Sequence, residues 1–439
     1  MRLYSTNDKN NVVNLREAVI QGLAKDNGLF VPFEIPTLES SFFKEMREMS
    51  FQDISFKVAE TLFDGEIPAG DLREIVKTAI NFDAPIVSLT DKIFSLELFH
   101  GPTSAFKDFG ARFMAGLLSY FTKESGQKIT ILVATSGDTG GAVASSFLGN
   151  PNINVIILYP SAKVSYIQEK QLTTLEQNIT ALEVKGTFDD CQKLVKTAFL
   201  DRELSNRFNL SSANSINIAR LVPQSFYYFY SYSRLPSQNL DGEVVYSVPS
   251  GNFGNLTAGI FAKKMGLPVS KFIAATNIND AVPTYLNSGQ FTARPSKETI
   301  SNAMDVGNPS NFARMSEIFE NKLENFKAHI EGFSYSDEQT RKAIQELYKQ
   351  FQYIPDPHGA IAYLGLKEYL RNKHDNKVTG IFLETAHPAK FLDVVEEEIS
   401  DKVVLPPSLK ACLSKEKKST VIENDYEKFK AFLLASELL

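Results

Sequence analysis

The segment Ile129-Thr130-Ile131-Leu132-Val133-Ala134-Thr135-Ser136-Gly137-Asp138-Thr139-Gly140-Gly141 decides the predicted fold. Its first six residues are apolar or β-branched, which is typical of a strand buried on both faces. A glycine-rich turn follows, then a predicted helix over 142–148 that ends at Gly149, and a second strand over 154–159. Two strands joined by one helix form a βαβ unit, so we expect parallel strands and a right-handed crossover.

The same alternation recurs along the chain. Further strands are predicted over 180–184, 244–248, 272–275 and 380–383, with mostly helix over 189–208. This order predicts an α/β fold with helix-covered, mostly parallel sheets. Before it, helical patterns cover 14–24 and 42–63, and dense charge on helical spacing covers 322–350. We expect a mostly helical N-terminal segment (1–80), a large α/β domain (81–120 and 215–439) and a smaller inserted α/β domain (121–214).

Composition excludes several classes of protein. The 439 residues are 43% hydrophobic and 22% charged, as in ordinary globular proteins, and the net charge of −6 offers no basic surface for nucleic acid. Two distant cysteines and five histidines show neither disulfide nor metal-ligand spacing. No signal-peptide run and no apolar stretch of about 20 residues is present, so we expect a cytoplasmic protein that spans no membrane and binds no metal.

One lysine stands in an unusual setting, His100-Gly101-Pro102-Thr103-Ser104-Ala105-Phe106-Lys107-Asp108-Phe109-Gly110. Small and aromatic neighbours would strip water from the Lys107 ammonium and favour its neutral form. A neutral amine can attack an aldehyde and form a Schiff base. A lone lysine is far more often a solvated surface residue, so this assignment needs support from the rest of the chain.

Two glycine-rich turns supply that support. Ser250-Gly251-Asn252-Phe253-Gly254-Asn255-Leu256 follows a strand and opens a helix, where free backbone N–H groups and the helix dipole suit a phosphate. Its spacing matches neither the P-loop nor the dinucleotide fingerprint. The turn over 134–140 offers hydroxyls and N–H groups that suit a carboxylate. A third segment, Ser211 to Arg220, contains Asn214, Ser215 and a guanidinium suited to phosphate, although a capped helix start with a surface arginine is the simpler interpretation.

Together, one desolvated lysine and two anion-binding turns match the needs of pyridoxal 5′-phosphate (PLP), which has an aldehyde and a phosphate and acts on amino acids. The lysine would hold the aldehyde, one turn the cofactor phosphate and the other a substrate carboxylate.

These segments together resemble the threonine synthase family, PLP enzymes of the tryptophan-synthase-β-like fold (fold type II). The resemblance rests on five motifs in the family's order: 100–110, 134–140, Asn214-Ser215-Ile216-Asn217 with Arg220, 248–259, and Thr385-Ala386-His387-Pro388-Ala389-Lys390-Phe391. Tyr4-Ser5-Thr6 and Gly28-Leu29-Phe30-Val31-Pro32 also look like the family's start. The residues of these motifs are similar to those of the family branch found in many bacteria and fungi.

The resemblance implies conversion of O-phospho-L-homoserine and water to L-threonine and phosphate, with PLP bound in the large domain. It implies that Lys107 is the Schiff-base lysine and main proton carrier. The cofactor would contact Gly251, Asn252, Phe253, Gly254, Asn255 and Leu256 through its phosphate, Thr385 at its pyridine nitrogen and Asp138 near its phenolic oxygen. The substrate carboxylate would be held by Thr135, Ser136, Gly137 and Thr139, and the substrate phosphate by Asn214, Ser215 and Arg220.

Two alternatives stay open at this point. A PLP lyase of the same fold would eliminate phosphate and release a keto acid, and the motifs do not distinguish it from a threonine-forming enzyme. A catalytically silent ligand-binding protein with the same fold is opposed by the intact Lys107 and both anion-binding turns. The oligomeric state, monomer or homodimer, is not defined by the sequence.

Overall fold

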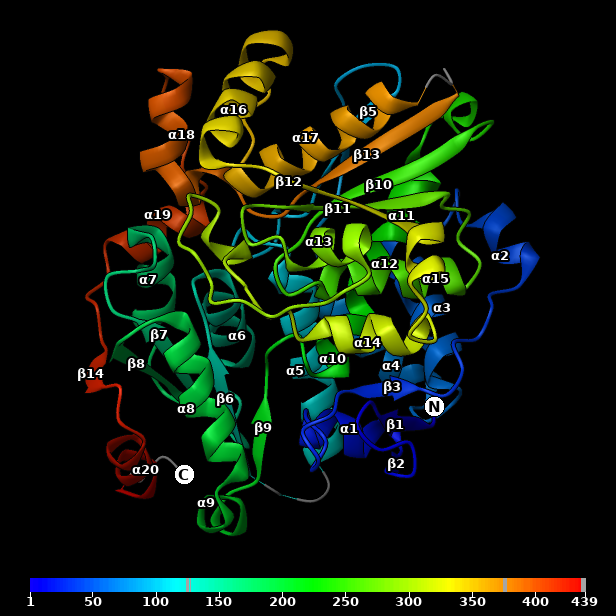
Figure 1. Cartoon of the computed structure of the whole chain (residues 1–439). Helices are drawn as coiled ribbons and strands as arrows, with labels where there is room; N and C mark the ends of the chain where they lie inside the picture. Colours follow the sequence, from blue (N-terminus) through cyan, green and yellow to red (C-terminus); the bar gives the residue numbers. More distant parts are fainter. Residues whose placement is uncertain (124–125, 127, 374–376, 436–439) are drawn as a thin grey trace.

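The computed structural model describes residues 1–123, 126, 128–373 and 377–435, and these form three sheets (Figure 1). A six-stranded sheet has the order β12-β11-β10-β13-β5-β4, and its neighbours are parallel except for the antiparallel edge strand β4. In the same order the strands span Ile330–Ser334, Lys271–Thr276, Glu243–Pro249, Val378–Glu384, Ile93–Glu97 and Ile86–Ser88.

The second sheet is five-stranded and entirely parallel, with the order β14-β8-β7-β6-β9. Its strands span Thr420–Glu423, Ile179–Lys185, Ile153–Pro160, Ile129–Ala134 and Leu210–Ser212. Figure 1 shows it at the lower left, with the six-stranded sheet above and to the right. A small antiparallel sheet joins β2 (Val12–Val13), β1 (Leu3–Ser5) and β3 (Phe30–Pro32) near the N-terminus.

Strand β6 shows why the continuous apolar run forms a central strand. Ile129, Ile131 and Val133 join the largest buried cluster, while Leu132 and Ala134 join a separate cluster on the other face. Successive strand side chains point to opposite faces, so a strand covered on both sides must be apolar at every position. The predicted strand over 129–134 is confirmed, as is the fold class of an α/β protein with mostly parallel sheets.

Helices cover both sheets. On the five-stranded sheet and its neighbours lie α6 (Asp138–Phe147), α7 (Tyr166–Thr173), α8 (Phe188–Leu200), α9 (Arg202–Arg207) and α20 (Tyr426–Ala435). Along the six-stranded sheet lie α12 (Gly254–Lys264), α13 (Ala281–Ser288), α14 (Asn311–Ile318), α15 (Leu323–His329), α16 (Asp337–Phe351) and α17 (Pro357–Asn372), followed by α18 (Leu392–Ile399) and α19 (Pro407–Leu413).

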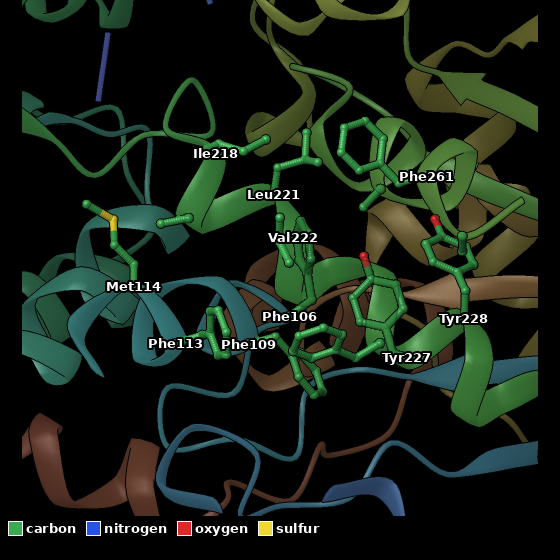
Figure 2. Close-up of a cluster of buried hydrophobic side chains, with 14 of the residues drawn as sticks. Phe106, Phe109, Phe113, Met114, Ile218, Leu221, Val222, Tyr227, Tyr228 and Phe261 are labelled. Atoms are coloured by element: carbon green, nitrogen blue, oxygen red, sulfur yellow. The ribbon is translucent and has the colours of Figure 1, made fainter. Parts of the chain in front are cut away.

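The helix α5 (Lys107–Lys123) contributes Phe109, Phe113 and Met114 to a cluster of buried hydrophobic side chains (Figure 2). Phe109 and Phe113 on α5 face Tyr227 and Phe226 of α11 (Phe226–Arg234), with ring centroids 5.5 Å apart in each pair. The aromatic run at 226–230 is therefore mainly core packing. This packing also fixes α10 (Ile218–Leu221) and the 3-10 helix η1 (Val222–Ser225) against α5.

The N-terminal helices are α1 (Leu15–Gln21), α2 (Ser40–Glu45), α3 (Phe51–Phe63) and α4 (Ala69–Ala79). The single helix predicted over 42–63 is wrong, because α2 ends at Glu45 and Ser50 caps a new helix by accepting a hydrogen bond from Asp53 N. The charged segment 322–350 is likewise interrupted by strand β12 between α15 and α16.

The C-terminal part of the chain requires one correction. We assigned 215–439 as a whole to the large domain, but β14 pairs with β8 of the five-stranded sheet, and Phe429 of α20 is buried in the cluster of that sheet. Sequence order does not reveal this return, because β14 is short and exposed. The remaining domain boundaries stay a prediction. None of the helices in the described ranges is both apolar and long enough to span a membrane.

Candidate active site

A cavity of about 510 Å³ opens where β6 and β10 end, at the carboxyl ends of strands from both sheets. Ligands of open α/β proteins bind at this edge of a parallel sheet. Most of the predicted site residues line the cavity: Lys107, Thr135, Ser136, Asp138, Thr139, Asn214, Ser215, Arg220, Gly251, Asn252, Phe253, Gly254, Asn255 and Thr385. Gly137 and Leu256 are buried directly beside it in the same two turns.

Lys107 is the first residue of α5, and its Nζ lies 4.2 Å from the centroid of the Phe106 ring. Burial, and to a smaller extent the positive charge of Arg220, lowers the pKa of Lys107 to about 8, against the opposing effect of Asp138. A substantial neutral fraction is therefore present near neutral pH, as a nucleophilic lysine requires.

The loop before Lys107 is held to the segment that contains Thr385. Ala105 and Ala386 form an isolated antiparallel bridge, Phe106 N donates to Thr385 O (2.8 Å) and His387 N donates to Ser104 O (3.0 Å). Two sequence motifs that are far apart in the chain thus form one wall of the cavity. Thr385 is buried and faces this cavity beside Lys107.

The turn after β10 has the form of an anion-binding site. Phe253, the residue before α12, has φ 60° and offers no side-chain cap to the helix. Leu256 N donates to Asn255 Oδ1 (3.0 Å), so the N–H groups of Gly254 and Asn255 are left for another acceptor. A Cβ on Gly251 would lie 2.7 Å from Met304 Cα, so only glycine fits there. Asn255 Nδ2 donates to Pro249 O (2.8 Å) and holds the turn closed.

The turn after β6 is built around Thr135. Its Oγ1 accepts from the N–H groups of Gly137 (3.0 Å) and Gly140 (2.9 Å) and donates to Gly137 O (3.1 Å). The hydroxyl of Thr135 is therefore committed to the turn. The half-buried hydroxyls of Ser136 and Thr139 remain on the cavity wall.

Asp138 has a buried partner that the sequence reasoning missed. Its carboxylate forms an ion pair with Lys390 Nζ at 2.6 Å and accepts from Gln168 Nε2 at 2.9 Å. Burial alone would raise the pKa of Asp138, but Lys390 and Gln168 outweigh it and hold the pKa below its ordinary value. The Asp138–Lys390 pair is neutral overall. Lys390 lies inside the 385–391 motif, so that motif contained the only sequence signal for it.

The third segment brings a buried cation to the cavity. Arg220 is buried, donates through Nη1 to Ala213 O, and its Nε has no hydrogen-bond partner among the described residues. Burial lowers the pKa of Arg220 to about 10, so it stays charged at neutral pH. The interpretation as a surface arginine is wrong. Asn214 Nδ2 donates to Ala134 O (2.8 Å), which ties this segment to the end of β6.

Ser215 lies between two asparagines. Its Oγ accepts from Asn252 Nδ2 (2.7 Å) and Asn311 Nδ2 (3.3 Å), so its own proton is free to be donated. Asn252 Oδ1 accepts from Ser310 N. Both functions of the Asn252 side chain are thus used to position Ser215 and the 310 backbone.

These features fit PLP: a neutral-capable lysine, an uncapped helix start whose turn excludes any Cβ at position 251, and a neutralised carboxylate nearby. No group of three or more His, Cys, Asp or Glu that could hold a metal ion occurs in the described part of the chain. Other cavity-lining residues not anticipated from sequence include His358 and, from the N-terminal segment, Thr6 and Asn7.

Comparisons with known proteins agree with this geometry. Residues 84–383 match the family "Pyridoxal-phosphate dependent enzyme", residues 2–80 match "Threonine synthase N terminus", and residues 359–433 match "Threonine synthase, C-terminal". The chain is 46% identical to the threonine synthase of Serratia marcescens over 93% of each sequence.

Solved structures give the same result. The crystal structure of threonine synthase from Escherichia coli superposes with a TM-score of 0.93 at 43% identity, over 99% of both chains. The PLP-bound threonine synthase from Brucella melitensis gives 0.91 at 34% identity, over 99% of this chain and 98% of that one. The expected fold type and cofactor are thereby confirmed. The chain belongs to the threonine synthase family of pyridoxal-phosphate dependent enzymes of fold type II.

Proposed function

We propose that the enzyme converts O-phospho-L-homoserine and water to L-threonine and phosphate, through γ-elimination of phosphate and addition of water at Cβ. The observation that carries the proposal is the placement of Lys107, with its lowered pKa, in one cavity with two glycine-rich helix starts and the buried Arg220. A substrate with an amine, a carboxylate and a phosphate needs this set of groups.

When bound, PLP supplies an electron sink that stabilises negative charge next to the substrate amine. Lys107 holds the cofactor aldehyde until the substrate amine takes its place. The freed Nζ is then a general base that removes the Cα proton and next a proton from Cβ. After phosphate leaves Cγ, a proton returns to Cγ. The hydroxyl of water then adds at Cβ while its proton goes to the released phosphate, and Lys107 returns a proton to Cα. Lys107 is well placed for these transfers because it begins a rigid helix at the cavity wall.

The two ends of the substrate would be held by different segments. We assign the carboxylate to the turn after β6, chiefly to Ser136 and Thr139, because the Thr135 hydroxyl and Gly137 N are used within the turn. The phosphate is assigned to Asn214, Ser215 and Arg220, where the Ser215 proton and the unpartnered Arg220 Nε support an anion. The cofactor phosphate is assigned to the 251–256 turn, and the pyridine nitrogen to Thr385.

The experiment is product analysis of the purified holoenzyme with O-phospho-L-homoserine, in which phosphate and amino acid are measured together. Equal amounts of phosphate and threonine are expected. Lys107→Ala should abolish both products, whereas Arg220→Ala should impair turnover far more than it impairs cofactor retention. Phosphate released together with 2-oxobutanoate would replace this proposal with the keto-acid lyase. A colourless protein that binds the substrate without turnover would indicate a silent binding protein.

The setting of the enzyme is also part of the proposal. Cys191 and Cys412 are both free thiols, which supports a reducing compartment, and we infer the cytoplasm. The partner is a small-molecule substrate, and the enzyme works as a monomer or homodimer without nucleic acid or membrane.

A further inference from the structure

Arg314 on α14 is a second buried arginine near the cavity, and its side chain is completely buried. Its guanidinium is held only by neutral acceptors. Nε donates to Phe30 O (3.1 Å), Nη1 to Ser215 O (3.3 Å) and Asn311 Oδ1 (2.6 Å), and Nη2 to Ile216 O (2.8 Å). Within the described ranges, no carboxylate forms an ion pair with it.

An uncompensated buried charge is costly, by several kcal/mol per ion in proteins. Burial lowers the pKa of Arg314 to about 9, which still leaves it protonated at neutral pH. Arg220 is the only other arginine among the largest fully buried side chains, and it too has no ion-pair partner in the described structure. Both guanidiniums donate to backbone carbonyls of residues 213–216, and two buried cations without an ion-pair partner at one segment favour an anion beside it.

The contacts of Arg314 lead to the segment assigned to the substrate phosphate. Two of its acceptors are the carbonyls of Ser215 and Ile216, so the carbonyl oxygens of this segment are turned toward Arg314. Asn311 extends the link, because it accepts from Arg314 and donates to Ser215 Oγ (3.3 Å) and to Asn252 O (3.0 Å). Arg314 therefore fixes the Ser215 hydroxyl that the proposed function assigns to the substrate phosphate.

We propose that Arg314 is a positioning residue for the substrate phosphate: it orients Ser215 through the backbone and Asn311, and it supplies positive potential behind the phosphate without touching it. This inference rests on the proposed function, since it takes the 214–220 segment as the seat of the phosphate. Arg220 would contact the substrate phosphate directly, whereas Arg314 would act on the phosphate through the 214–217 segment.

The test uses the holoenzyme and inorganic phosphate as the probe. Arg314→Met should weaken phosphate inhibition at least tenfold and raise KM for O-phospho-L-homoserine by a similar factor, with kcat changed less than threefold and the visible spectrum of bound PLP retained. Arg314→Lys, which keeps the charge, should recover most of the phosphate affinity. Arg234→Met is the control for loss of a guanidinium that donates to backbone carbonyls: Arg234 donates to those of Arg47 and Met49, but it is exposed and lies away from the cavity.

If Arg314→Met does not fold, Asn311→Asp introduces a negative charge beside the intact arginine, and at least tenfold weaker phosphate inhibition is again expected. Unchanged phosphate inhibition in the folded variant would overturn the inference. Loss of PLP with phosphate inhibition intact would also overturn it, by placing Arg314 behind the cofactor. If the unmodified holoenzyme forms threonine while Arg314→Met behaves as wild type, only this inference fails. If the unmodified holoenzyme neither binds phosphate nor forms threonine, the proposed function fails.

Discussion

At the scale of single residues, two lysines differ in whether a carboxylate pairs with them. Lys107 is half-buried and pairs with no carboxylate of the described residues, and desolvation by the surrounding protein lowers its pKa to about 8. Lys390 is more deeply buried and contacts Asp138 at 2.6 Å. A lysine side chain without a paired carboxylate, as at Lys107, thus has a lowered pKa, whereas Lys390 is a fixed counter-charge to Asp138.

The rate at which the cofactor-free protein captures PLP should rise with pH and level off above about pH 8, because only neutral Lys107 reacts and each pH unit below its pKa reduces that form about tenfold. Stopped-flow absorbance across a pH series measures this midpoint. Arg220→Met removes a cation that lowers the Lys107 pKa and should move the midpoint upward. A wild-type midpoint near 10.5, the ordinary value for lysine, would contradict the burial argument.

Lys390→Met should destabilise the protein by about 3–5 kcal/mol, because it leaves the Asp138 carboxylate buried without its counter-charge. The double variant Asp138→Asn with Lys390→Met removes both charges and should recover part of the loss. Denaturant unfolding of the holoenzyme measures both values. Lys402→Met is the control, since Lys402 pairs with Glu396 at the surface and is 89% exposed, so little change is expected. Additive losses in the double variant would rule out a coupled pair.

At the scale of elements, both glycine-rich turns join a strand that ends at the cavity to a helix that starts there. Glycine makes this possible at Gly137, which has φ 146° and packs directly on Gln168. The same Gln168 donates to Asp138, so the turn and the ion pair share one supporting side chain.

Gly137→Ala should cost about 1–3 kcal/mol of stability and raise KM for the substrate, because the added methyl group is strained at this φ and collides with Gln168. Gly65→Ala is the matched control. Gly65 also has a positive φ of 75° but has open space around its Cα, so it should show the backbone cost without the effect on KM. Thermal unfolding measures the loss of stability in both variants, and steady-state kinetics measures their KM. If both variants lose the same stability and have the same KM, the Gln168 side chain moves aside without cost and the collision argument is wrong.

At the scale of the whole molecule, the C-terminal segment connects the two large sheets. After α17, α18 and α19, the chain returns to add β14 to β8, and α20 then packs on α8. Because α8 lines the cavity with Phe188, Gln192 and Lys196, this segment supports one wall of the active site from behind.

Phe429→Ala should destabilise the protein by about 3–5 kcal/mol, since the ring is completely buried among the side chains of α8 and its sheet. Val421→Ala in the neighbouring β14 is the control, because Val421 is 55% exposed and a change within about 0.5 kcal/mol is expected. Chemical denaturation monitored by circular dichroism measures both. If Phe429→Ala unfolds like wild type, the C-terminal helix contributes no stability to this part of the molecule.

The features that could be predicted from the sequence are those that depend on local signals. The apolar run of β6, the glycines of the two turns and the small and aromatic residues around Lys107 each constrain the backbone or solvation of their immediate neighbours. The strand, the turns, the cofactor and the lysine could therefore be predicted. The Asp138–Lys390 pair, the burial of Arg220 and Arg314, and the pairing of β14 with the second sheet became known from the folded structure alone. Each of these joins residues that are remote in the chain, and their energies come from desolvation and pairing that exist only after the segments have been brought together.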